Sequence, residues 1–206
     1  MALNAQGYFN CLNSYLNIKD YCLQQTKADK IILTENGFVE SGSKEVEYKV
    51  NLVTTGEVIV MKLDQPKSTR TGKQESAPPL FHFLDDNAKP WSKRCDFVVF
   101  NRRKNQIFAY CLEFKSESIP QDVTTQLQAS IDWIKSLHAT VKAYTGKRFA
   151  MRVTKYVLSN HPAPGPYLDA EQKYLLRDHT IRHYHYSDID GMALEDLDNT
   201  NVDVIF

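Results

Sequence analysis

The sequence predicts one α/β domain in which a mixed β-sheet is flanked by helices. Its 206 residues can bury one good core, so one elaborated domain is favoured over two. The apolar content of 42% and the charged content of 24% are ordinary for a globular protein. Helical and strand-like patterns follow one another in the order helix, hairpin, hairpin, helix, strand, which is typical of a mixed-sheet α/β fold.

The N-terminal part is expected to supply a helix and a first hairpin. Apolar residues recur at helical spacing over residues 7–26. Two strand-like segments, 46–53 and 57–63, are separated only by Thr54-Thr55-Gly56, which predicts a hairpin. The next segment, residues 64–92, contains four prolines and a glycine and is therefore predicted to be a long loop.

A second hairpin is predicted over residues 96–115. Two apolar runs flank a polar, basic turn, which we place at Arg102–Asn105 with Asn101 paired to Gln106. The second run is apolar on both faces, as expected for a buried central strand.

The C-terminal half is predicted to continue with a helix, a strand, a short helix and a last strand: residues 120–138, 149–159, 168–177 and 181–186. A proline-rich turn separates the first strand from the short helix. The single domain, residues 1–206, is accordingly divided into a core, a C-terminal elaboration and an acidic tail: residues 7–159, 160–187 and 188–206.

Three charged residues lie among the apolar residues of the second hairpin. In the predicted register, Asp96 and Glu113 are diagonal neighbours on one face, with Cβ atoms roughly 6–8 Å apart, and Lys115 shares that face. A register slip of two residues would keep this arrangement, whereas a slip of one would destroy it. Buried carboxylates are costly unless a cation or partner offsets their desolvation, and their hard oxygen atoms suit Mg²⁺ or Mn²⁺. The pattern favours a divalent-metal site for cutting phosphodiesters, in which a lysine orients water or stabilises charge on phosphate.

These residues resemble the PD-(D/E)XK nuclease superfamily, which has the restriction-endonuclease-like fold. Asp96 opens one strand and Glu113-Phe114-Lys115 ends the next, as in the motif of that superfamily. The order of predicted elements also resembles its αβββαβ core, over roughly residues 94–159. The sequence departs from the namesake motif at Cys95, where the motif has proline. The resemblance implies that Asp96 and Glu113 are metal ligands and that Lys115 is the catalytic lysine.

The resemblance implies further features of the site and of its substrate. Many members place a glutamine on the helix that follows, and Gln126 is the matching candidate, with Gln128 as the fallback. Some members supply another acid from the first helix or the strand after it, and Glu45 or Glu47 could serve. The implied activity is Mg²⁺- or Mn²⁺-dependent hydrolysis of phosphodiester bonds, with DNA favoured over RNA, in prokaryotic defence or nucleic-acid processing.

Charge is unevenly distributed although the net charge is zero. Residues 188–206 contain six acids and no lysine or arginine, which leaves a net charge of about +6 on the rest of the chain. Basic residues of the long loop and of the hairpin turn are candidates for phosphate contacts: Lys67, Arg70, Lys73, Arg102, Arg103 and Lys104. The acidic segment is compatible with shielding this basic surface, with binding a partner and with a solvated tail.

Other functional classes are disfavoured. No apolar stretch approaches a membrane span, and the N-terminus lacks the pattern of a secretory signal. The four cysteines form no CxxC pair, which favours buried thiols in a reducing compartment and hence a cytoplasmic protein. His183 and His185 alternate as a zinc pair would, but no third ligand stands at a recognisable spacing. Gly72-Lys73 and Gly146-Lys147 lack the earlier glycine of a P-loop.

Two alternatives from other classes stay open. The first is a catalytically inactive module of the same fold that binds nucleic acid. The second is a subunit of an assembly, either a homodimer or the partner of a larger system, in which the long loop and the acidic segment are interfaces. The complete set of Asp96, Glu113 and Lys115 favours an enzyme over the first alternative, and the second does not exclude catalysis.

Overall fold

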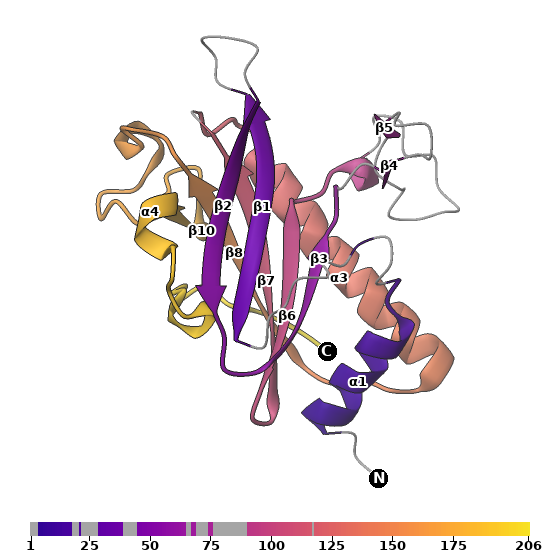
Figure 1. The fold of residues 1–206 in the computed structure, drawn as a ribbon. Helices are drawn as coiled ribbons and strands as arrows, with labels where there is room; N and C mark the ends of the chain where they lie inside the picture. Colours follow the sequence, from indigo (N-terminus) through magenta and orange to yellow (C-terminus); the bar gives the residue numbers. More distant parts are fainter. Residues whose placement is uncertain are drawn as a thin grey trace.

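The structure of the chain is a computed structural model. It describes residues 4–17, 21, 29–38, 45–64, 67–68, 74–75, 90–116 and 118–206. Within these ranges, the side chains of residues 37–38, 45–46, 67–68 and 74–75 are left out of the description. Figure 1 shows an α/β fold in which a long mixed sheet has helices on one side and a separate strand pair on the other.

The main sheet has seven strands, most of them antiparallel. Its path is β3 (Glu57–Lys62), β6 (Phe97–Arg103), β7 (Gln106–Lys115), β8 (Met151–Ser159), β10 (Asp178–His185) and β9 (Tyr174–Leu175), and β11 (Asp203–Ile205) pairs with β8. Strand β7 is parallel to β8, and β8 is parallel to β10. The carboxyl ends of these three strands therefore lie at the same edge of the sheet.

Two helices cover one face of this sheet. Helix α1 (Ala5–Tyr15) and helix α3 (Val123–Thr145) pack against the side chains of β7 that alternate through Ile107, Ala109 and Cys111. These small and medium side chains leave room for α3, as their period of two along the strand predicts. Helix α1 ends at Tyr15, because Leu16 is already extended, and residues 18–20 and 22–26 of the predicted helix 7–26 lie outside the described residues. The predicted helix 120–138 begins three residues later and continues to Thr145, where Gly146 adopts a left-handed conformation.

A two-stranded sheet covers the other face. Strands β1 (Lys30–Phe38) and β2 (Glu45–Val53) are antiparallel and bury Ile31, Leu33, Val50 and Leu52 against the bulky side of β7. Strand β1 was not predicted from the sequence, and the predicted pairing of residues 46–53 with residues 57–63 is wrong. Strand β2 pairs with β1, whereas β3 pairs with β6 in the main sheet. Because the two-stranded sheet lies on the larger sheet, the apolar face of each is buried against the other. A hairpin that continued the larger sheet would not cover this face.

The second hairpin is confirmed, with its register shifted by two residues. Arg103 pairs with Gln106, so the turn consists of Lys104 and Asn105, and Phe97 pairs with Leu112. Lys104 has a positive φ of 51°, as a tight hairpin turn requires. The shift places Asp96 directly opposite Glu113 instead of diagonally, and it preserves the shared face because the side-chain period is two.

The C-terminal part differs from the prediction in two places. Residues 168–177 form no helix, because the Asp169 carboxylate accepts hydrogen bonds from the backbone N–H groups of Lys173 and Tyr174 and holds a turn. The acidic segment 188–206 is folded. It contains the end of α4 (Tyr186–Ile189) and strand β11, and it buries Leu194.

The remaining described elements are short. They are strands β4 (Lys67–Ser68) and β5 (Gln74–Glu75), which pair with each other, and 3-10 turns at Pro90–Ser92, Gly165–Tyr167 and Leu194–Asp196. In the described part of the chain, no helix has the length and apolar character that crossing a membrane requires.

Candidate metal centre

Asp96 and Glu113 meet at the end of the main sheet where β6 begins and β7 ends. The backbone N–H of Asp96 donates to Glu113 Oε2 at 3.2 Å, and the backbone N–H of Phe114 donates to Asp96 Oδ2 at 2.6 Å. Asp96 is 7% exposed and Glu113 is 1% exposed. The hairpin register thus fixes both carboxylates in a largely dry position, as the sequence predicted.

Lys115 completes the predicted set. Its ammonium forms an ion pair with Glu113 Oε1, and 18% of its side chain is exposed. The Tyr186 hydroxyl donates to the Lys115 carbonyl at 2.9 Å, which holds the end of β7 in place. Lys115 therefore stands between the buried carboxylates and the solvent.

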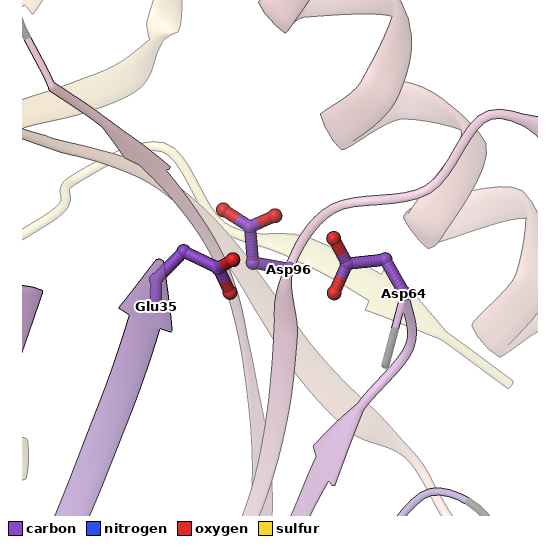
Figure 2. Close-up of side chains that lie close together, drawn as sticks. All are labelled: Glu35, Asp64 and Asp96. Carbon is purple, nitrogen blue, oxygen red and sulfur yellow. The ribbon is translucent and has the colours of Figure 1, made fainter. Parts of the chain in front are cut away.

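Two further carboxylates join the site, and the sequence analysis missed both. Glu35 lies on β1 and Asp64 follows the end of β3, and Figure 2 shows both carboxylates turned toward Asp96. One oxygen atom from each of the three residues lies within 4.8 Å of the others. The backbone N–H of Leu63 donates to the Asp96 carbonyl at 2.9 Å, which keeps the two chain segments side by side.

The additional acid that the sequence analysis sought on Glu45 or Glu47 comes instead from Glu35. Glu47 is exposed on β2, opposite Asn36, and the side chain of Glu45 lies outside the described residues. The available signal was the position of Glu35 two and four residues after Leu33 and Ile31, which places it on the apolar face of a strand. Assigning it required knowing that this run is a strand and that it crosses the main sheet.

The pKa values of Asp64, Asp96 and Glu113 are raised. Burial, then the negative charges of Glu113, Asp64 and Glu35, raise the pKa of Asp96 well above its usual value. Burial raises the pKa of Glu113 to about 7, although Lys115 opposes this shift. Burial and the charge of Glu35 raise the pKa of Asp64, and Lys62 acts against them. Protons or a cation are therefore needed to hold the four groups together at neutral pH.

Two lysines neutralise part of this charge. Lys62 Nζ lies 2.7 Å from a carboxylate oxygen of Glu35 and donates to the Thr34 carbonyl at 3.0 Å. Burial lowers the pKa of Lys115, but Glu113 and Asp96 outweigh burial, so its pKa is raised and the side chain is an ammonium at neutral pH. Four carboxylates against two lysines leave an excess of negative charge for a cation.

The residues fit Mg²⁺ or Mn²⁺. These ions prefer hard oxygen ligands, and all the converging acids are carboxylates. Among the described residues, the buried Asp64 Oδ1 has no hydrogen-bond partner, which is costly unless a ligand satisfies it. Asp96, with Glu35 and Asp64 on one side and Glu113 on the other, would be the central ligand.

Gln126 lies in the first turn of α3, the helix that follows the hairpin. Its Oε1 is buried and has no hydrogen-bond partner among the described residues. Its carbonyl accepts from the Ser130 hydroxyl at 3.0 Å, and this hydroxyl accepts from the backbone N–H of Cys95 at 2.8 Å. Ser130 thus ties α3 to the residue before Asp96. The fallback, Gln128, is exposed and donates to Asp132.

The basic turn lies at the opposite end of the sheet, a strand length of roughly 30 Å away. Arg102 pairs with Glu57 at 2.6 Å, and Arg103 stacks on the Phe108 ring at 4.1 Å. Lys104 is exposed at the turn. The structure therefore does not bring these three residues to the carboxylates, and their contact with phosphate stays a prediction. Arg70, Lys73 and the side chain of Lys67 lie outside the described residues.

The histidines form a different arrangement. His183 Nε2 is 2.8 Å from the Ser159 hydroxyl, and His185 Nδ1 is 2.7 Å from the Ser187 hydroxyl. Burial lowers the pKa of His183 to about 4, so this side chain is neutral at pH 7. Among the described residues, the group of three side chains that could hold a metal ion consists of Glu35, Asp64 and Asp96, and it contains no histidine.

Comparisons of the chain with protein-family models, curated proteins and solved structures found no match. The geometry and chemistry of the site therefore carry the functional argument.

Proposed function

We propose that this protein is a metal-dependent nuclease of the restriction-endonuclease-like fold. The order α1, β3, β6, β7, α3, β8, with β7 parallel to β8, is compatible with the αβββαβ core of that fold. The observation that carries the proposal is the convergence of Glu35, Asp64 and Asp96 at one end of the sheet, where Glu113 accepts from the Asp96 backbone N–H and pairs with Lys115.

The chain's own residues supply distinct parts of the chemistry. Asp96 and Glu113, with Glu35 and Asp64, would hold Mg²⁺ or Mn²⁺, and the bound ion would polarise the phosphate and lower the pKa of water. Lys115 is already protonated, so it acts by stabilising the charge that develops on phosphate oxygens and not as the base. Hydrolysis adds the oxygen of water to phosphorus and breaks one phosphorus–oxygen ester bond, and the leaving oxygen takes up a proton.

DNA is the favoured substrate, and a role in prokaryotic defence or nucleic-acid processing follows from the resemblance alone. A cytoplasmic location follows from the pattern of the cysteines. A catalytically inactive module of the same fold is the alternative. The orphaned Asp64 Oδ1 and the raised pKa values of Asp96 and Glu113 favour the enzyme, because an inactive module has no need of four converging carboxylates.

The test is cleavage of single- and double-stranded DNA and RNA by the full chain, with Mg²⁺, Mn²⁺ or a chelator. We expect cleavage with either ion and loss of cleavage in the chelator, in Asp96→Asn and in Lys115→Met. Asp132→Asn, an exposed acid on α3, is the matched control and should cleave like the wild type. Cleavage that persists in chelator and in both site variants would contradict the mechanism.

A further inference from the structure

A cavity of about 680 Å³ lies beside the end of β7. Its walls come from three loops: the segment between β7 and α3, the 3-10 turn after β8, and the residues after β9. The lining includes Ile119, Pro120, Tyr167, Leu176 and Arg177. The volume is in the range of pockets that bind small organic groups.

The backbone joins this cavity to the candidate metal centre. The residues of its first wall, 118–121, follow Lys115 in the chain, and the backbone N–H of Asn160 donates to the Lys115 carbonyl at 3.2 Å. The next residue, His161, has its ring 5.2 Å from the ring of Tyr167. Two of the three walls of the cavity therefore belong to loops that leave the sheet at the same edge as Lys115.

The chemistry of the lining indicates a flat, anionic ligand. Tyr167 offers an aromatic face that is only partly buried, and Leu176 is 59% exposed although it is apolar. Arg177 donates to the Ile119 carbonyl at 2.6 Å, and no carboxylate of the described residues pairs with its guanidinium. A guanidinium has five N–H donors, so most of them stay available for phosphate oxygens.

We propose that this cavity binds an unpaired nucleobase of the substrate strand, adjacent to the scissile phosphate. Tyr167 stacks on the base and Arg177 binds the neighbouring phosphate, as in sites for single-stranded nucleic acid. The inference rests on the proposed nuclease function and adds a substrate class to it. A base inside a duplex cannot enter such a cavity, so the substrate nucleotide is single-stranded or extruded from its helix.

The test is equilibrium binding of a fluorescein-labelled oligothymidylate of about 12 nucleotides, measured by anisotropy with Asp96→Asn so that no strand is cut. Tyr167→Ala and Arg177→Ala should each weaken binding about tenfold, and Tyr167→Phe should retain it. Tyr144→Ala and Arg148→Ala are the matched controls, because both residues are exposed at the far end of α3 and beyond it. A melting curve of each variant checks that the fold is intact.

The outcomes separate this inference from the proposed function. If the wild type cleaves DNA but Tyr167→Ala and Arg177→Ala match their controls in Kd and KM, the nuclease stands and the base site is overturned. If no condition gives cleavage but the two variants lose affinity, the base site stands and the nuclease fails. Equal affinity for the duplex form, or no affinity of the parent protein for the oligonucleotide, would also overturn the base site.

Discussion

The two ends of the β6–β7 hairpin carry charges of opposite sign, and these charges are offset by neighbouring side chains to different extents. At the turn, Arg102 has Glu57 as a partner and Arg103 has the Phe108 ring, so the positive charges are offset locally. At the other end, Asp96 and Glu113 are buried beside two more carboxylates, with two lysines to offset four negative charges. The charges at the turn are thus offset by neighbouring side chains of the fold, whereas the carboxylate end has more acids than lysines to offset them.

Asp96→Asn should have the largest effect, because it should lower the rate of cleavage and raise the stability of the metal-free protein. We expect cleavage to fall on the order of 10²–10³-fold, as when one charge-stabilising group is removed from an active site. The unfolding free energy of the metal-free protein should rise by about 1–3 kcal/mol, because the variant removes a carboxyl group whose charged form is disfavoured by burial and by the neighbouring acids, and Asn still accepts the Phe114 N–H. Denaturant melts without metal measure the second effect, and a large loss of stability would contradict our account of the cluster.

The stability of the carboxylate end should depend on pH and on metal. The folded pKa of Glu113, about 7, lies above its unfolded value of about 4.3. Its stabilising contribution is therefore complete below pH 4 and is lost as pH rises through 7, and Asp96 is shifted in the same direction.

The metal-free protein should accordingly lose stability between about pH 4.5 and 7.5. Mn²⁺ should reverse this loss, with a stabilisation of about 2.7 kcal/mol when its concentration is a hundred times the Kd. The shift in Tm should be larger at pH 8 than at pH 5.5, where protons compete for the carboxylates. Equal shifts at both pH values, or none, would mean that the cluster does not bind the ion.

Substitutions at the turn should have the smallest effect. Arg102→Ala removes a partly exposed ion pair and Arg103→Ala removes a stacked guanidinium, so each should cost about 0.5–1 kcal/mol of unfolding free energy. Neither should change the Mn²⁺-induced shift in Tm, because the turn lies at the far end of the hairpin. A change in that shift would show that the two ends of the hairpin are coupled.

Local sequence pattern was sufficient for the hairpin and its carboxylates. Two apolar runs with a short polar turn predict antiparallel strands, and the period of two then assigns Asp96, Glu113 and Lys115 to one face. The register was off by two residues, because the pattern does not say whether the turn has two or four residues. The error was harmless, since a slip of two leaves every side chain on its face.

Local pattern failed where the partner of a segment is distant in sequence. Residues 46–53 and 57–63 look like neighbours, but β2 packs on the outer face with β1 and β3 joins the main sheet. The segment 188–206 looks like a solvated acidic tail, yet it is held by long-range contacts. Asp190 accepts from the backbone N–H of Asn51 at 2.9 Å, and the Met192 carbonyl accepts from Val53.

Residue types and their alternation are local properties, so the sequence alone was enough to predict a carboxylate pair with a lysine at the end of a buried hairpin. The number of carboxylates that converge depends on the tertiary structure. Glu35 and Asp64 reach Asp96 because a second sheet crosses the first and because β3 pairs with β6. Such contacts depend on which apolar faces bury one another across the whole chain, and no window of neighbouring residues contains that information.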